Sequence, residues 1–177
     1  MSTPTTTPPP AATWDGETWE LQLPDPEATF QAGRLLGESA VAPLVVALNG
    51  GLGAGKTSLA QGVGAAAGLP FALTSPTFAL INELDGHPPI LHADLYRLEP
   101  GELVHLGFEE QLEAWGGISL VEWAERAPEA LPLDHLEVQL ELSADGGRRL
   151  RARSRGSWAD RSLHRWIQAW TAAQGGA

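Results

Sequence analysis

Apolar residues form short continuous runs in the middle of the chain and alternate with polar residues towards both ends. The continuous runs are LVVAL at Leu44–Leu48 and ISLVEW at Ile118–Trp123. Such runs are typical of parallel strands that are buried on both faces. Alternation predicts a strand in WELQL and a hairpin in HLEVQLEL and RRLRARSR, which the turn SADGG joins. TFALINEL and ILHADLYRL, separated by DGHPP, predict a further hairpin or two neighbouring strands.

Helical patterns lie between these strands. Asp25 is a plausible N-cap, Pro26 suits the first helical position and Glu27 suits the positive end of a helix. A second helix is predicted over Lys56–Ala67, and short ones around Glu102–Leu106 and Glu109–Trp115. A final helix over residues 157–173 carries its apolar residues on one face, which predicts core packing or, alternatively, a face that docks a partner. These apolar residues are Leu163, Trp166, Ile167 and Trp170.

The order of strands and helices predicts an α/β fold of three layers, with a mainly parallel central sheet and antiparallel additions. Residues 1–13 are rich in threonine and proline and are expected to form a disordered tail. The remaining residues, 14–177, are expected to form a single domain, since domains usually contain roughly 100–200 residues.

Composition narrows the function classes. The formal net charge is −11, which disfavours stand-alone binding of nucleic acid because phosphate neutralisation supplies most of that affinity. The chain has no cysteine, so a disulfide framework and a thiolate site are excluded. We see no signal peptide and no apolar run that approaches the roughly 20 residues of a membrane helix. A cytoplasmic location is therefore expected.

The segment NGGLGAGKTS carries the strongest functional motif. Gly50, Gly55, Lys56 and Thr57 match G-x-x-x-x-G-K-[ST], with an apolar strand before and a helix after, which predicts a phosphate-binding P-loop. Lys56 is the only lysine of the chain, and the other ten basic residues are arginines. A compact ammonium fits the ring of loop amides better than the larger planar fork of arginine, which explains the exception. The Thr57 hydroxyl is expected to bind Mg²⁺.

Acidic residues end two of the predicted strands. P-loop enzymes need an acid at such a position to hold Mg²⁺, and Asp94 and Glu122 are the candidates. Thr77, in the SPTF segment, is a candidate for contacting Mg²⁺ or the γ-phosphate, or else belongs to a plain turn. His92 shares a strand face with Asp94 and either orients the site or is a hydrogen-bonded core histidine.

Five segments in order resemble the TsaE (YjeE) family, small P-loop ATPases of bacterial tRNA threonylcarbamoyladenosine modification. They are GGLGAGKTS, SPTFALINE, HADLYRL, LGFEEQL and ISLVEWAER, and the resemblance extends over roughly residues 23–155. It implies a P-loop NTPase fold, with ATP and Mg²⁺ as cofactors. It also implies catalytic roles for Lys56, Asp94, Glu122 and Thr77, and metal ligation by Thr57, Asp94 and Glu122. The nucleotide-binding positions that it implies are Leu52, Gly53, Ala54, Gly55, Lys56, Thr57, Trp123, Arg148 and Pro26.

The resemblance also implies partners and a cellular role. Family members act with the TsaD–TsaB complex, in which TsaD performs the transfer that forms t⁶A in tRNAs reading codons that begin with adenine. ATP turnover is expected to cycle that complex, and tRNA is expected to be contacted mainly through it. One departure concerns Gly51, where the family usually has Asp or Asn. The change leaves the backbone amides in place but loosens the loop or removes a polar contact.

The residues alone leave alternatives open. A small-molecule P-loop kinase would share the loop and the size, but we find no clear arginine-rich lid segment. A non-hydrolysing, nucleotide-gated interaction module would bind nucleotide without turnover. Arg97 and Arg126 are candidates for an arginine finger. The basic run Arg148–Arg155 is either a solvated edge strand or a contact to tRNA, to an acidic partner or, through Arg148, to nucleotide.

Overall fold

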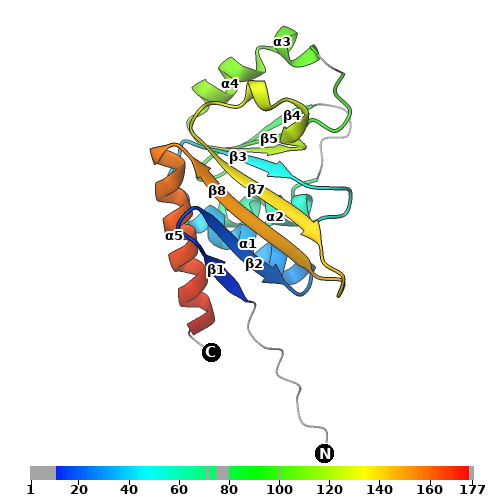
Figure 1. The fold of residues 1–177 in the computed structure, drawn as a ribbon. Coiled ribbons are helices and arrows are strands. Elements are labelled where there is room, and N and C mark those ends of the chain that lie inside the picture. The colour runs from blue at the N-terminus through cyan, green and yellow to red at the C-terminus, as the bar shows by residue number, and fades with distance from the viewer. Residues whose placement is uncertain (1–10, 71, 75–79, 100, 176–177) are drawn as a thin grey trace, which may run out of the picture.

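The structure is a computed structural model, and it describes residues 11–70, 72–74, 80–99 and 101–175. In this part of the chain one mixed sheet has eight strands in the order β1-β2-β8-β7-β3-β6-β5-β4 (Figure 1). The strands are β1 Ala12–Trp14, β2 Thr18–Leu23, β3 Leu44–Asn49, β4 Ile81–Leu84, β5 Ile90–Asp94, β6 Ile118–Glu122, β7 His135–Leu142 and β8 Arg148–Arg155.

Strand direction divides the sheet into a parallel centre and antiparallel edges. β5, β6, β3 and β7 are parallel neighbours, whereas β4 joins one side and β8, β2 and β1 join the other in antiparallel pairs. The predicted fold class is confirmed, as are both predicted hairpins, β4–β5 and β7–β8. Parallel strands place their carboxyl ends at one edge of the sheet, so Asn49, Asp94 and Glu122 end close together.

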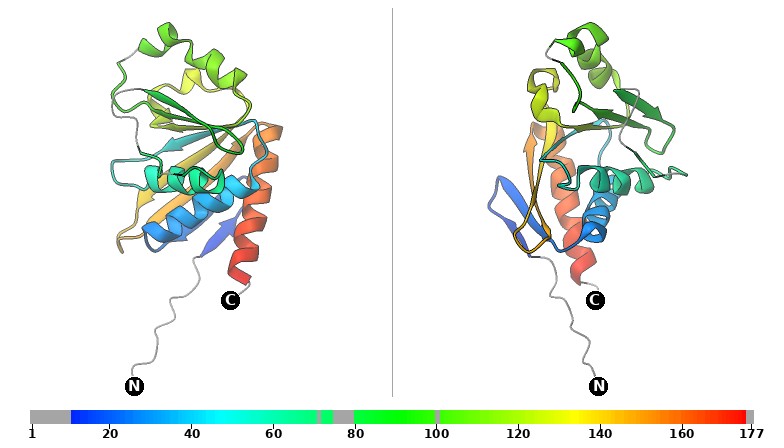
Figure 2. Two further views of the ribbon diagram at one scale, coloured as in Figure 1. Left: turned by 180° about the vertical axis from the view of Figure 1, so that it is seen from behind. Right: turned by 90° about the vertical axis from the view of Figure 1, so that its right-hand side faces the viewer.

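Helices cover both faces of the sheet. The helices are α1 Pro26–Ser39, α2 Lys56–Ala66, α3 Glu102–Leu106, α4 Phe108–Ala114 and α5 Ser157–Gly175, with 3₁₀ turns η1 Ala124–Arg126 and η2 Pro128–Ala130. α1, α2 and α5 pack on one face, which Figure 2 shows from behind, and α3 and α4 contribute to the core on the other. β3 supplies Leu44, Val46 and Leu48 to the first core and Val45 and Ala47 to the second, as expected for a strand buried on both faces.

The tryptophans of α5 anchor that helix in the first core. The Trp166 ring meets Trp19 edge-on at 4.9 Å between centroids, and its indole nitrogen donates to the Ala32 carbonyl of α1 at 2.9 Å. Trp170 also meets Trp19 edge-on, with 6.3 Å between the ring centroids. The predicted apolar stripe is therefore core packing. α5 runs two residues beyond the predicted end at 173, to Gly175.

Two sequence predictions need correction. The expected tail extended to residue 13, but β1 begins at Ala12 and pairs with β2, because alternate backbone groups of Ala12–Trp14 find partners along Trp19–Leu21. Residues 1–10 lie outside the described part. The basic run was expected as a possible edge strand, but β8 lies between β2 and β7.

Alternation along β8 places Leu150 and Ala152 in the first core and the arginines at 149, 151, 153 and 155 on the opposite face of the sheet, where glutamates compensate them. The ion pairs are Arg149–Glu20 at 3.5 Å, Arg151–Glu20 at 3.1 Å, Arg153–Glu17 at 3.1 Å and Arg155–Glu137 at 3.1 Å. Exposed ion pairs of this kind contribute about 0–1 kcal/mol each. Their effect here is to neutralise the strand, which weakens the case for a basic surface that binds tRNA.

Among the described residues, no helix has the length and apolar character that crossing a membrane requires.

Candidate functional site

The P-loop connects β3 to α2 at the carboxyl edge of the parallel strands. Gly50, Gly53 and Gly55 adopt φ values of 140°, 75° and 108°, which side chains rarely tolerate. Gly55 is the N-cap of α2 and offers no side-chain acceptor to the first turn. The positive end of the helix therefore faces the loop and favours an anion there.

The Lys56 side chain turns back across the mouth of this loop. Its ammonium donates to the carbonyls of Gly50 at 2.5 Å and of Gly51 at 2.9 Å, and lies 3.9 Å from the centroid of the Trp123 ring. The residue is only 5 % exposed. Burial lowers the pKa of the Lys56 ammonium from its usual 10.5, and the negative charge of nearby carboxylates, with Glu122 first, partly opposes that change.

Glu122 is the buried acid of the site. It ends β6, is 2 % exposed, and its Oε2 accepts from the Thr57 hydroxyl at 3.2 Å. Its Oε1 lies 2.8 Å from His92 Nε2, and because a carboxylate only accepts, that nitrogen is the donor. His92 Nδ1 has no hydrogen-bond partner among the described residues. His92 is fully buried and hydrogen-bonded to Glu122, which fits both interpretations, the core histidine and the residue that orients a site carboxylate.

Asp94 lies beside Glu122 at the same edge. The two residues are register partners in the parallel β5–β6 pair. Asp94 is less buried, and its Oδ1 accepts from the backbone N–H of Tyr96 at 2.9 Å. The adjacent strand ends therefore bring two carboxylates to the loop that holds Lys56 and Thr57.

Sequence reasoning missed a clamp that fixes the start of the loop. The Glu125 carboxylate accepts from the N–H of Gly50 at 3.4 Å, while the Glu125 N–H donates to Asn49 Oδ1 at 3.1 Å. Glu125 belongs to η1, which begins two residues after Glu122, the last residue of β6. Its hydrogen bonds therefore tie the end of β6 to the loop. Tyr96, which lines the site, was missed as well. The sequence offered one indication for each residue: Tyr96 lies two residues after Asp94, and Glu125 lies three residues after Glu122.

These groups surround one cavity of about 260 Å³. It is lined by Leu52, Gly53, Ala54, Gly55, Lys56, Thr57, Ser58, Asp94, Tyr96, Glu122, Trp123 and Arg148. Arg148 reaches it from β8, where its Nη2 lies 3.4 Å from the Gly53 carbonyl. Pro26 is not among the lining residues; it begins α1, whose Thr29 lies against Gly55. Thr77 lies outside the described residues.

The donor set suits Mg²⁺. This ion prefers hard oxygen ligands and is usually held by one or two carboxylates together with substrate phosphates and water. The Thr57 hydroxyl and the two carboxylates supply such oxygens. The described residues hold no group of three or more acidic or histidine side chains arranged for a metal. A magnesium ion here would complete its shell with phosphate oxygens and water.

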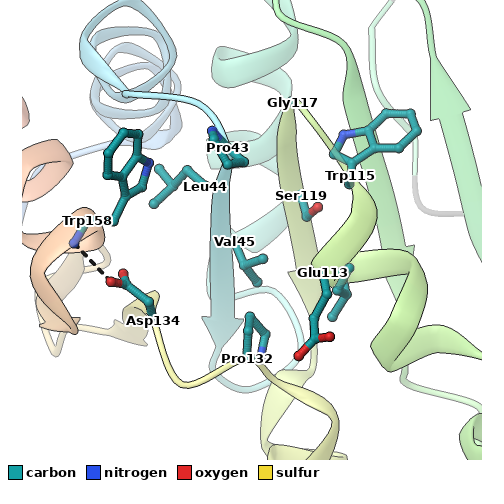
Figure 3. Close-up of a pocket in the computed structure, with 11 residues that line it drawn as sticks. Pro43, Leu44, Val45, Glu113, Trp115, Gly117, Ser119, Pro132, Asp134 and Trp158 are labelled. Carbon is teal, nitrogen blue, oxygen red and sulfur yellow. Dashed lines mark hydrogen bonds between the residues drawn. The ribbon is translucent and has the colours of Figure 1, made fainter.

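Another cavity, of about 250 Å³, lies at the opposite edge of the sheet (Figure 3). Leu44, Val45 and Ser119 line it from the amino ends of β3 and β6. Its Asp134 carboxylate accepts from the backbone N–H groups of Trp158 at 2.9 Å and Ala159 at 2.7 Å, so it caps α5. This mainly apolar cavity lacks the loop amides and the cation that a phosphate needs.

Comparison with known proteins identifies the family. Residues 23–150 match the family model described as "Threonylcarbamoyl adenosine biosynthesis protein TsaE". The chain belongs to the TsaE family. A tRNA threonylcarbamoyladenosine biosynthesis protein TsaE from a Nostoc species is 44 % identical to it over 133 residues, covering 73 % of this chain and 82 % of the relative. The TsaE of Bacillus subtilis is 36 % identical over 127 residues, covering 71 % and 79 %.

A solved structure supports the same assignment. The crystal structure of Bacillus subtilis YdiB has a TM-score of 0.71 to this TsaE family member, with 26 % sequence identity. The likeness covers 89 % of this chain and 97 % of the other. The resemblance inferred from five sequence segments is confirmed, and the chain is a member of a family that takes part in t⁶A biosynthesis.

Replacing Gly51 with alanine is expected to leave the TsaE fold intact, whereas Gly50→Ala is expected to damage it. A Cβ on Gly51 would meet no atom within 4 Å, and its φ is not in the left-handed region. A Cβ on Gly50 would lie 2.2 Å from the Leu140 carbonyl oxygen. Thermal unfolding should show Gly51→Ala unchanged or stabilised by about 0.4–1 kcal/mol, the usual gain from a stiffer unfolded chain. A large loss of stability in Gly51→Ala would contradict this view of the loop.

The Lys56 ammonium is expected to titrate below the usual pKa of 10.5, because burial disfavours its charge. Between the lowered value and 10.5 the unfolded chain binds more protons than the folded one, so stability should rise with pH across that window. The Glu122 carboxylate opposes the shift, so Glu122→Gln should lower the pKa of Lys56 further. NMR of labelled lysine in the folded and the urea-unfolded protein measures both values; equal midpoints would contradict the prediction.

Proposed function

We propose that this TsaE family member binds ATP and Mg²⁺ in the P-loop cavity and hydrolyses the nucleotide. Its hydrolysis would support formation of t⁶A in tRNAs that read codons beginning with adenine. The observation that carries the proposal is the meeting of a buried lysine, a hydroxyl and two carboxylates around one cavity, at the N-terminus of a helix whose cap residue is a glycine. Membership of the family supports the biological role.

The loop and Lys56 would hold the phosphates. The backbone amides of residues 52–57, which line the cavity, would surround the phosphates, and the Lys56 ammonium would contact the β- and γ-phosphates. Thr57, Asp94 and Glu122 would hold Mg²⁺, which when bound neutralises charge that develops on the phosphates. We assign Thr77 a switch-like role next to the γ-phosphate.

The other assigned residues would bind the rest of the nucleotide. Trp123 and Arg148 line the cavity, with Arg148 held over the loop by the Gly53 carbonyl. Pro26 is assigned to the adenine end, and Thr29 in the same helix brings α1 against Gly55. Glu122, with its carboxylate oriented by His92, is also suited to position the attacking water.

The proposed partners are the TsaD–TsaB complex and, through it, tRNA. ATP turnover would reset that complex between rounds of modification, in the cytoplasm, and would supply none of the carbamoyl chemistry. A net charge of −11 and compensated β8 arginines support contact with tRNA mainly through the complex. The chain alone is expected to hydrolyse ATP slowly.

The test measures phosphate release by the purified chain, alone and with the two partner subunits and tRNA, together with modified adenosine. Partners should raise phosphate release and sustain repeated modification cycles, and Lys56→Ala should lose both. A rate of phosphate release that the partner subunits do not change, but that a small-molecule acceptor raises, would favour a kinase instead. Tight nucleotide binding without turnover, even with partners, would favour a nucleotide-gated interaction module.

A further inference from the structure

A row of side chains lies beside the Lys56 ammonium. The Trp123 ring lies 3.9 Å from Nζ, the Tyr96 ring lies 4.8 Å from that of Trp123 with planes inclined at 42°, and the Arg126 guanidinium lies 5.8 Å from the Tyr96 ring centre. Tyr96 follows Asp94 by two residues, and Trp123 follows Glu122 directly. The two strand ends that supply the acids therefore also supply a stacked aromatic pair at the lysine.

Trp123 adopts an uncommon backbone conformation to reach this position. Its φ of 58° is the one positive value for a non-glycine residue in the described part of the chain. A bulky residue occupies this region only where its surroundings hold it there. The Trp123 N–H donates to the Leu48 carbonyl at 2.9 Å, and its carbonyl accepts from Arg126 at 3.0 Å. The ring itself packs against the second core and against Tyr96.

The lysine ammonium has three N–H donors. Two are used by the carbonyls of Gly50 and Gly51, which leaves the third to the face of Trp123. A cation on an aromatic face is held more weakly than one that makes a charge-assisted hydrogen bond to phosphate. A phosphate oxygen can therefore replace the ring while the two carbonyls keep the lysine in place.

We propose that Tyr96 is a positioning residue for Lys56. Its ring holds Trp123 over the ammonium, so that in the empty loop the lysine is already at the mouth, with one donor on an exchangeable aromatic face. This inference rests on the proposed binding of a nucleotide phosphate at the same loop. Arg126, which covers Tyr96, then supports the stack and is not the residue that contacts the phosphates.

The first experiment uses the single lysine of the chain as a probe, without nucleotide. NMR of the full-length protein labelled at lysine reports the ε-CH₂ protons of Lys56 alone, which a ring face shifts upfield. The wild type should show this upfield signal, Tyr96→Phe should keep it, and Tyr96→Leu should move it towards the position of free lysine. Trp123→Leu, which removes the contact directly, gives the reference for complete loss.

Arg161→Gln is the matched control. Arg161 lies 5.2 Å from the ring of Trp158 on α5, so this variant removes another cation from another tryptophan and should leave the Lys56 signal unchanged. Tyr96 is 45 % exposed, so Tyr96→Leu should fold, which thermal unfolding checks. An ε-CH₂ signal that is the same in Tyr96→Leu as in the wild type, or that is not upfield in the wild type, overturns the inference.

The second experiment adds ATP and magnesium. ATP should move the Lys56 signal in the wild type, and Tyr96→Leu should bind ATP about two- to tenfold more weakly, because a lysine that the ring no longer holds must be ordered when the phosphate binds. Tyr96→Phe should bind as the wild type does. Equal affinity in Tyr96→Leu overturns the positioning role even if the stack exists. No ATP effect on the wild-type signal would instead reject the proposed nucleotide site.

Discussion

Lys56→Ala is expected to abolish ATP binding and turnover, and Lys56→Arg is expected to do nearly the same. Loss of the ammonium should weaken nucleotide binding on the order of 10²-fold or more, because each hydrogen bond to a charged group is worth about 1.5–3 kcal/mol. The arginine variant keeps the charge but not the fit. In the structure the ammonium is enclosed by two loop carbonyls and the Trp123 ring. A planar guanidinium with five donors cannot occupy that space without displacing them.

Nucleotide affinity by calorimetry and phosphate release with partners present are the measurements. Arg34→Ala is the control, since it removes a cation from an exposed pair with Glu38, at 2.8 Å, and should change neither quantity. Full activity in Lys56→Arg would show that the site needs only a positive charge. The single lysine in an arginine-rich chain would then be an accident of composition.

Much of the fold was predictable because its strands are strongly patterned. The continuous apolar run Leu44–Leu48 contributes side chains to both cores, as its sequence predicted for a strand buried on both faces. In β7 and β8 apolar and polar residues alternate, and only the apolar ones are buried in the core, as predicted for strands buried on one face. Asp25 caps α1 as predicted, accepting from the Ala28 N–H at 2.8 Å. The place of β8 was not predictable. Its alternation is the same for an edge or an interior strand, and only pairing with β2 decides.

The parts of the candidate site that were predictable are those whose position follows from the order of strands and helices along the chain. The P-loop and the acids at strand ends follow from strand and helix order, because parallel strands end at one edge of the sheet. Contacts between side chains far apart in sequence were not. The clamp of Glu125 on Gly50 spans 75 residues, and the stack of Tyr96 on Trp123 depends on a left-handed φ that tryptophan rarely adopts. Position just after the two acids marks Tyr96 and Glu125 as candidates, but no local sequence pattern specifies the contacts that they make.

Glu122→Gln is expected to leave nucleotide affinity largely intact and to lower Mg²⁺-dependent hydrolysis by about 10²–10³-fold, the usual effect of removing one preorganised electrostatic group. Glutamine keeps the shape in a position that is 2 % exposed: its oxygen, in place of Oε1, still accepts from His92, and its NH₂ group, in place of Oε2, can donate to the Thr57 hydroxyl oxygen. The variant loses the negative charge that would hold the metal and activate water. Glu122→Ala would also leave His92 buried without a partner and should cost stability as well.

Single-turnover phosphate release and nucleotide affinity, each with magnesium or with EDTA, separate these effects. Glu113→Gln is the matched control, because that acid lines the cavity at the opposite edge of the sheet and should not affect hydrolysis. Removal of magnesium should reduce the wild type to the level of Glu122→Gln and should scarcely change the variant further. Normal hydrolysis in Glu122→Gln would remove this carboxylate from the mechanism and leave Asp94 as the acid of the metal site. If a fall in nucleotide affinity accounts for the whole loss of hydrolysis, Glu122 acts in nucleotide binding and not in the chemical step.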